Sequence, residues 1–407
     1  MFEEHKWLYL RSTLDRTRMK LQDLIKAIYP LESKARECYS EKVQMNSEKF
    51  MEMMLLHGCF ILELLRREAE SYSSDEHDSE DPIFIIPWVL PSLAADFLKL
   101  ENQIPYCILH TLFESLNHTE NGESNLPRLA LGFFSRISGT PKNADDEKLR
   151  RTMISSDYEH LLDLVRTTYT EGFSIILPRR SCSNGKKLLE RWLGINRDPF
   201  EEDNEFESIS VISTMSKLRN SGIKAKKVED NENFLAVTFH EGTLYMATIT
   251  FINSIGPFLR NCIAYEQCNG RTNLHFTTYF LRNCIAYEQC NGRTNLHFTT
   301  YALLLDYLVD TTQDVEAFCK EKIFENLLGS DEELVSFING LGKEITWKVE
   351  SSYLYDEFVA IERYYNNPWL RYWTLFKTSY MKTHGFFYQQ HSFKPFTVFG
   401  FYHNNSK

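Results

Sequence analysis

Residues 51–67 read MEMMLLHGCFILELLRR, and this stretch decides the fold class. Arranged as a helix, this stretch has hydrophobic side chains on nearly every face, which is typical of a central buried helix. Asn46 and Ser47 precede it as candidate N-caps, with Glu48 in the first turn. His57 lies within the run, where we expect a hydrogen-bonded core residue rather than a ligand.

Helical patterns continue on both sides of this segment. Apolar residues at helical spacing predict one amphipathic helix from Trp7 to Ile28, which Pro30 ends. Pro91 and Pro105 fit the first turns of two helices that form a hairpin, and its polar corner, 101–103, favours a structural cap over a contact surface. Further helices are expected at about 32–44, 129–135, 157–169, 301–309, 315–328, 330–341 (with a capping box at 330–333) and 351–380.

A small sheet interrupts the helices. Residues 222–228, 233–240 and 243–251 alternate and are rich in Val, Thr and Phe, and Glu241-Gly242 is a hairpin turn between the last two. The sequence therefore predicts a mostly α-helical protein with a small antiparallel β-sheet insertion, an α+β class.

One segment of 22 residues, FLRNCIAYEQCNGRTNLHFTTY, occurs at 258–279 and again, letter for letter, at 280–301. Two copies are too few for a solenoid. Identity of the copies favours a recent tandem duplication or a gene-prediction error. Only one copy can occupy the place that the fold reserves for it, and the other becomes an insertion. The sequence leaves open which copy docks.

The pattern predicts one domain over 1–345, followed by a C-terminal helix and tail at 346–407. Within that domain we expect helices over 1–200, the sheet at about 222–251, the duplicated segment at 258–301 and helices again over 301–345.

Composition excludes several classes of protein. With 45 Lys+Arg against 56 Asp+Glu, the net charge of −11 argues against a nucleic-acid partner. The nine cysteines are scattered without a CxxC pair, which suits a reducing compartment. Each repeat copy offers Cys-x5-Cys-x6-His, but zinc sites usually use tighter pairs. A double metal site is the disfavoured alternative.

No reaction can be assigned from motifs. The chain has no GxGxxG, P-loop, GxSxG elbow, HExxH or kinase set, so we assign no catalytic, cofactor-binding or metal residue and expect no cofactor. The acidic run 71–81 is interpreted as a solvated loop, with recruitment of a basic partner as the alternative. Basic residues are interpreted as solvated faces, with a local anionic contact as the alternative; they stand at 66–67, 150–151, 179–180, 186–187, 224 and 226–227.

Several strings together resemble the plant proteins grouped as domain of unknown function 247 (UPF0481-type). Leu100-Glu101-Asn102-Gln103-Ile104-Pro105 is the most specific of them. The others, in chain order, are 4–10, 54–63, His160-Leu161-Leu162-Asp163-Leu164, Arg260-Asn261, 264–268, 328–333 and Tyr364-Tyr365 with Trp369 and Trp373. The resemblance covers roughly residues 2–375 in the right order.

The resemblance implies a largely helical plant protein, often with a C-terminal membrane anchor at the plasma membrane or an endomembrane, and some members are implicated in self-incompatibility recognition. This chain departs from that pattern in three places. It starts at the family's first long helix, it carries the extra copy, and after Trp373 it reads MKTHGFFYQQHSFKPFTVFGFYHNNSK where an apolar anchor is expected. We therefore expect a divergent, truncated or mispredicted member that, as written, is soluble and cytoplasmic.

Three functional hypotheses follow. The leading one is a non-enzymatic interaction or recognition protein with a protein partner. The alternatives are a membrane-associated protein that has lost or altered its anchor, and an enzyme of undescribed type, which would need convergent polar groups in a pocket.

Overall fold

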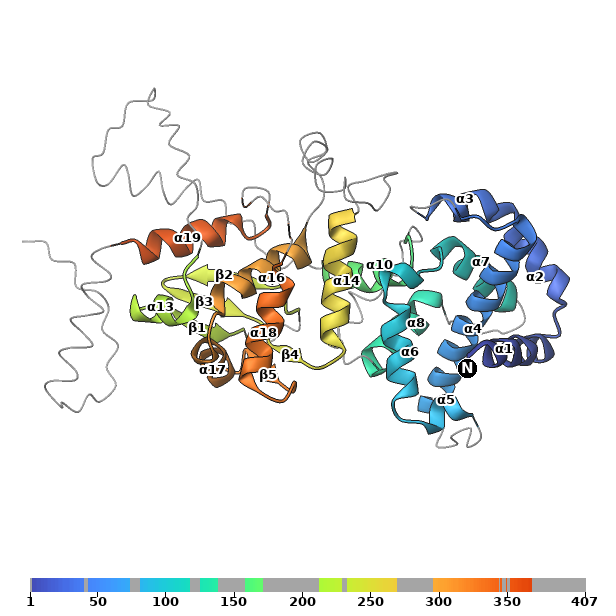
Figure 1. Cartoon of the computed structure of the whole chain (residues 1–407), viewed down its shortest axis with the longest axis horizontal. Coiled ribbons are helices and arrows are strands. Elements are labelled where there is room, and N and C mark those ends of the chain that lie inside the picture. The colour runs from blue at the N-terminus through green and yellow to red at the C-terminus, as the bar shows by residue number, and fades with distance from the viewer. Residues whose placement is uncertain are drawn as a thin grey trace, which may run out of the picture.

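The computed structural model describes residues 2–39, 43–73, 81–117, 125–137, 158–170, 212–228, 233–268, 296–343, 345, 349 and 352–367. The N-terminal helices lie at one end, the sheets and C-terminal helices lie at the other, and α10 and α14 lie between them (Figure 1). Buried apolar side chains from both ends belong to one connected core. The division into domains at residue 345 stays a prediction.

Every secondary-structure element described in the first half is a helix. The elements of this half are α1 (Phe2–Thr17), α2 (Leu21–Ile28), η1 (Tyr29–Leu31), α3 (Glu32–Glu37), α4 (Ser47–Ser73), α5 (Pro82–Ile85), α6 (Val89–Phe97), η2 (Leu100–Asn102), α7 (Tyr106–Asn117), α8 (Leu126–Ile137) and α10 (Leu161–Thr170).

Helix α4 is the central helix that its sequence predicts. An unbroken run of its side chains from Cys59 to Leu65 is buried, so neighbouring helices pack around it. Asn46 caps its start, since the Asn46 carboxamide oxygen accepts the Lys49 N–H at 2.9 Å. The His57 Nε2 lies 3.0 Å from the Lys6 Nζ of α1, which confirms the predicted hydrogen bond, although His57 is half-buried and not part of the core.

The predicted helix from Trp7 to Ile28 is in fact two helices, α1 and α2. Arg18 has a left-handed φ of +57°, which ends α1 and turns the chain before Leu21. The apolar spacing runs through this break because both helices face the same core, so the pattern alone cannot reveal it. The predicted helix at 32–44 is shorter, since α3 ends at Glu37.

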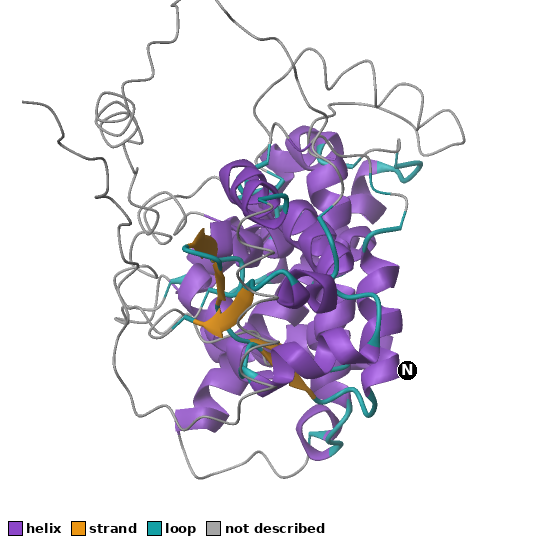
Figure 2. Ribbon diagram, turned by 90° about the vertical axis from the view of Figure 1, so that its left-hand side faces the viewer, coloured by secondary structure: helices purple, strands orange, loops and turns teal. Residues whose placement is uncertain are grey.

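The second half mixes helices with two small sheets (Figure 2). Its elements are α13 (Met215–Asn220), β1 (Lys224–Lys227), β2 (Val237–His240), β3 (Thr243–Met246), β4 (Ile249–Phe251), α14 (Ile255–Cys268), α16 (His297–Leu308), α17 (Thr312–Lys320), β5 (Phe324–Asn326), α18 (Asp331–Leu341) and α19 (Tyr355–Tyr365).

The predicted single antiparallel sheet is wrong in its topology, although the mostly helical α+β class is confirmed. Strands β2 and β3 form the predicted hairpin, with positive φ angles of 49° at Glu241 and 73° at Gly242. Strand β1, however, pairs with β3 in parallel, in the order β1-β3-β2. Strand β4 leaves this sheet and pairs in parallel with β5.

Two of the predicted C-terminal helices are shorter in the structure. The helix expected at 315–328 ends at Lys320, because Lys322 has a φ of +57° and the chain then extends into β5. The helix expected at 351–380 is described from Tyr355 to Tyr365, and its remainder falls largely outside the described residues. Half of the capping box predicted at 330–333 is present: the Ser330 hydroxyl accepts the Glu333 N–H at 3.2 Å, but among the described contacts Glu333 does not bond back to the Ser330 N–H.

Each copy of the repeat supplies one part of the described fold. Residues 258–268 of the first copy form most of α14, and residues 297–301 of the second copy begin α16. Both segments are buried, with Cys262 at 0% exposure and Tyr301 at 1%. The residues between them, 269–295, lie outside the described part of the chain.

The residues that flank each copy explain this choice. Gly256 precedes the first copy, and a Cβ at this position would lie 2.7 Å from the Phe337 ring. The second copy carries Thr278 at the equivalent position, so it cannot dock as α14 without a clash.

Burial of the residues that follow the repeat explains why the second copy, and not the first, supplies the start of α16. Leu304 and Leu305, which follow the second copy in α16, are 1% and 0% exposed. Arg282 and Asn283 stand at the equivalent positions after the first copy, and neither can be buried there without unsatisfied polar groups.

We predict that deleting residues 269–290 leaves the described fold intact. The deletion shortens the connection between α14 and α16, residues 269–296, from 28 residues to 6. A shorter connection has a lower closure entropy, so the free energy of unfolding should rise by about 1 kcal/mol. Urea unfolding followed by circular dichroism measures it. A loss of helical signal or of several kcal/mol would show that the extra residues belong to the fold.

Candidate functional site: a buried polar centre

Three of the strings singled out in the sequence meet inside the molecule. The turn after α6 carries Gln103, the start of α10 carries His160 and Asp163, and α14 carries Asn261 and Glu266. With Arg166 of α10 we call these six side chains the buried polar centre. Helices α10 and α14, which supply four of them, lie between the two ends of the molecule (Figure 1).

Gln103 connects the end of α6 with the start of α10 by hydrogen bonds. Its side-chain Nε2 donates to the carbonyl oxygens of Phe97 at 2.8 Å and Lys99 at 2.6 Å. Its Oε1 accepts the N–H of Leu162, in the first turn of α10, at 3.2 Å. The prediction that corner 101–103 is a structural cap is thereby confirmed, because Gln103 satisfies groups at the end of one helix and the start of another.

Asn261 joins α14 to the same corner. Its Oδ1 accepts the Leu100 N–H at 2.9 Å, and its Nδ2 donates to the Pro257 carbonyl at 2.7 Å. Leu100 and Asn261 are 161 residues apart in the sequence, so the sequence pattern around one of them does not predict its contact with the other.

Glu266 connects α14 with α10 and α16. Its carboxylate accepts the N–H groups of Phe298 at 3.1 Å and Thr299 at 2.9 Å, and Arg166 Nη2 donates to it at 3.2 Å. It thus supplies the acceptor that Leu296, at the N-cap of α16, lacks. Burial raises the pKa of Glu266 above its ordinary value, while Arg166 and the helix N–H groups lower it.

His160 caps the start of α10. Its Nδ1 accepts the Asp163 N–H at 3.0 Å, and its ring lies 4.9 Å from the Tyr265 ring. Burial lowers the pKa of His160 to about 4, so the imidazole is neutral and can accept this bond at neutral pH.

We predict that acidification weakens the fold through His160. The folded pKa of about 4 lies below the ordinary 6.5, so the unfolded chain binds the proton more readily. The contribution is complete above pH 6.5 and is lost as the pH falls toward 4, by at most about 3 kcal/mol. Urea unfolding at pH 7 and pH 4.5 should show a smaller pH effect in His160→Asn, which caps without titrating. An unchanged difference between the two pH values would contradict the role.

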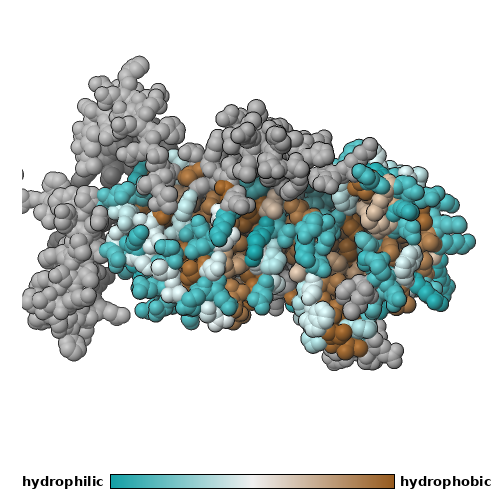
Figure 3. All heavy atoms as spheres, viewed as in Figure 1, coloured by the Kyte–Doolittle hydropathy of each residue, from teal (hydrophilic) through white to brown (hydrophobic). Residues whose placement is uncertain are grey.

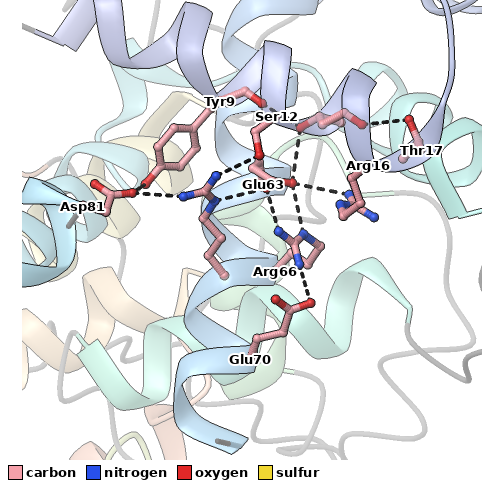
Figure 4. Close-up of polar contacts among 10 residues, drawn as sticks. Tyr9, Ser12, Arg16, Thr17, Glu63, Arg66, Glu70 and Asp81 are labelled. Carbon is pink, nitrogen blue, oxygen red and sulfur yellow. Dashed lines mark hydrogen bonds and ion pairs between the residues drawn. The ribbon is translucent and has the colours of Figure 1, made fainter. Parts of the chain in front are cut away.

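A second polar cluster lies where α1 packs on α4 (Figure 4). The Glu63 side chain is fully buried and meets Arg66 Nη2 at 2.6 Å, Arg67 Nε at 3.1 Å and Arg16 Nη2 at 3.3 Å. Burial would raise the pKa of Glu63, but the hydrogen bonds and charges of the arginines outweigh it, so the pKa is lower than usual. We call these four residues the Glu63 cluster.

Asp81 extends the Glu63 cluster to α5. It accepts from the Tyr9 hydroxyl at 2.6 Å and Arg67 Nη1 at 3.2 Å, and its Oδ1 accepts the Ile83 N–H at 3.0 Å as the N-cap of α5. The prediction that 71–81 is a solvated loop is wrong for Asp81, whose side chain is 9% exposed, and for residues 71–73, which end α4. Residues 74–80 of that loop lie outside the described part of the chain.

Asp314 ties α13 to α17. Its carboxylate accepts the N–H groups of Ser216 at 2.7 Å, Thr311 at 3.0 Å and Asp310 at 3.2 Å. Sequence reasoning missed this residue, and only its place three residues after Thr311 signals a helix cap.

The contacts that these polar residues make stabilise the structure. The acids accept from helix N–H groups or arginines, and burial raises the pKa of the Cys262 thiol well above its ordinary value, so it stays protonated and poorly nucleophilic. Their chemistry is to fix the positions of helix ends that lie far apart in sequence.

Comparison with known proteins decides the family. The profile of DUF247, described as "Plant protein of unknown function", matches residues 1–281 and again 274–388. The chain belongs to the DUF247 family. The two matches overlap inside the repeated segment, where the profile must restart because the repeat supplies 22 extra residues.

Two DUF247-type relatives from Arabidopsis thaliana are similar over most of the chain. The "UPF0481 protein At3g47200" is 29% identical over 384 residues, which is 91% of this chain and 71% of the relative. The "Putative UPF0481 protein At3g02645" is 21% identical over 426 residues, which is 86% of this chain and 72% of the relative. No solved structure matches this DUF247 chain.

Over the residues with described positions, no group of three or more His, Cys, Asp or Glu side chains is arranged to hold a metal ion. Of the repeat's Cys-x5-Cys-x6-His patterns, His275, Cys284 and Cys290 lie outside those residues. No helix within the described ranges is both long and apolar enough to span a bilayer.

Proposed function

We propose that this DUF247 protein is a non-enzymatic interaction protein that binds a protein partner through an apolar surface between α5 and α6. The surface consists of Ile85, Ile86 and Trp88, which are 53%, 37% and 63% exposed. This exposed group is the observation that carries the proposal, because adjacent large apolar side chains left in water are typical of binding surfaces.

The position of this surface supports the proposal. Hydrophobic side chains are visible at the lower edge of the N-terminal half, where Figure 1 places α5 (Figure 3). Asp81 anchors α5 to α1 and α4 through Tyr9 and Arg67, so the surface is presented on a fixed support. A rigid support lowers the entropy that a surface loses on binding.

The buried groups also favour binding over catalysis. Glu63, Glu266 and Asp314 are each bonded to arginines or helix N–H groups, which occupies the oxygens that acid or base chemistry would use. Trp is among the residues that dominate binding energy at interfaces, so Trp88 is the side chain we expect to matter most.

We predict that Trp88→Ser removes partner binding and leaves folding unchanged. Leu327→Ser is the matched control, since Leu327 is also exposed, at 66%, but lies beyond β5. Affinity capture from plant tissue with wild type and both variants should return a defined protein that only Trp88→Ser loses, by at least tenfold. Urea unfolding of all three proteins checks that each is folded.

Two outcomes would overturn this assignment. Equal capture by both variants would show that the surface between α5 and α6 takes no part in binding. Co-sedimentation with phosphatidylcholine–phosphatidylserine vesicles that Trp88→Ser abolishes would place the surface against lipid instead of protein.

A further inference from the structure

Five basic side chains gather on α13 and the adjoining strand β1. Lys217 and Arg219 are exposed on α13, and Lys224, Lys226 and Lys227 are exposed on β1. No acidic residue occurs between positions 212 and 228, although the whole chain has a net charge of −11. This is a concentrated positive surface on an acidic protein.

The five charges have no partner among the described residues. Arginines elsewhere in the fold, such as Arg66 and Arg166, are held in ion pairs with buried carboxylates. The side chains of the α13–β1 group make no ion pair or hydrogen bond with any residue of known position. Unlike those paired arginines, they have no counterion among the described residues that would compete with an outside anion.

In the described part of the chain, β1 also has one edge that pairs with no other strand. It is the outer strand in the order β1-β3-β2, and the N–H groups of Lys224 and Val228 donate to Gly242 and Met246 on the β3 side. Because N–H directions alternate along a strand, those of Ala225 and Lys227 point away from β3. No residue within the described ranges accepts them.

We propose that β1 and α13 form a docking edge for an acidic, extended segment of a protein partner, which adds to β1 as a further strand. Backbone groups of the segment would pair with Ala225 and Lys227, and its carboxylates would meet the lysines on both sides of the strand. The inference rests on the proposed interaction function, and it adds a second surface and the chemistry of its partner.

The free edge favours a peptide over other anions. Alternating N–H and C=O groups along β1 match another strand, whereas phosphates on a nucleic acid or a membrane would use only the positive charges. The acidic remainder of the chain also opposes the long phosphate track of a nucleic acid. Lysines on edge strands can instead serve to prevent aggregation. That role predicts self-association when the charges are removed and no peptide affinity.

The first test uses a fluorescein-labelled peptide of alternating glutamate and valine, eight residues long, and measures fluorescence anisotropy at 50 mM and 200 mM NaCl. We expect saturable binding that weakens with salt and is at least tenfold weaker in the double variant Lys224→Glu, Lys226→Glu. The control variant Lys34→Glu, Lys49→Glu has the same net charge and should bind as wild type.

The second test separates strand addition from simple charge attraction. Lys227→Pro removes an outward N–H together with the charge, whereas Lys227→Gln removes the charge alone, so Lys227→Pro should bind the peptide several-fold more weakly. A peptide with the same number of glutamates and proline in place of valine should not bind. Equal affinity for the valine and proline peptides would overturn the strand-addition mechanism.

Three further outcomes would overturn the proposal. One is tighter binding of a single-stranded oligonucleotide or an anionic vesicle, lost in the same lysine variant. Another is self-association of that variant without any peptide affinity in wild type. The third is peptide binding that emerges only after the chain's own acidic runs, 201–207 and 229–232, are neutralised. Capture through Trp88 does not involve β1, so the two proposals can fail separately.

Discussion

Replacing Glu63 with glutamine should lower the free energy of unfolding by about 3–5 kcal/mol. The Glu63 side chain is fully buried and accepts from three arginines, of which Arg66 and Arg67 are each only 21% exposed. Glutamine keeps the volume but removes the buried charge that the three arginines share, so Arg66 retains only the exposed Glu70 and Arg67 retains only Asp81. Urea unfolding at pH 7, followed by far-UV circular dichroism, measures the loss.

Glu70 offers a matched control on the same helix. It also pairs with Arg66, but its side chain is 62% exposed, and an exposed ion pair contributes at most about 1 kcal/mol. Glu70→Gln should therefore fall within about 1 kcal/mol of wild type. A Glu63→Gln variant as stable as Glu70→Gln would contradict the view that the Glu63 cluster holds α1 against α4.

The pH dependence of Glu63 runs in the same direction as that of His160. Its folded pKa lies below the ordinary value, so its contribution is present above the unfolded pKa near 4.5 and is lost as the pH falls. Acid should thus weaken the Glu63 cluster as well as the cap that His160 forms on α10.

The long helices could be predicted from sequence because their signal is local and repeated. Helix α4 carries apolar side chains over many turns, and the start of α7 is set by Pro105. The break at Arg18 had no such signal, because a non-glycine residue takes the left-handed conformation there. Strand β5 is three residues long, too short for any periodicity, and the helical pattern of α17 runs into it.

The resemblance strings could be recognised in the sequence, but their purpose could not. Gln103 reaches an N–H that lies 59 residues away, and Glu266 reaches the first turn of α16 across the rest of the repeat. Such pairs depend on how helices pack, and no spacing rule encodes that packing. Choosing between the repeat copies likewise needed the contact between Gly256 and Phe337.

The second large effect is expected at Glu266. Its carboxylate is 3% exposed, caps the first turn of α16 and pairs with Arg166, whose side chain is 16% exposed. Glu266→Gln removes the closer of the two carboxylates beside Arg166, leaving only Asp163 at 3.9 Å, and replaces a charged cap with a neutral one. We expect a loss of about 3 kcal/mol.

The repeat itself contains the ideal control for this variant. Glu288 is the same residue in the second copy, with the same neighbours in sequence. The fold described above takes α14 from the first copy, so Glu288 has no place in α14.

The most direct test of this account is therefore the free energy of unfolding of Glu266→Gln and Glu288→Gln, measured side by side in the full chain. If the first copy supplies α14, Glu266→Gln loses about 3 kcal/mol and Glu288→Gln stays within about 0.5 kcal/mol of wild type. Equal losses, or a larger loss for Glu288→Gln, would contradict it.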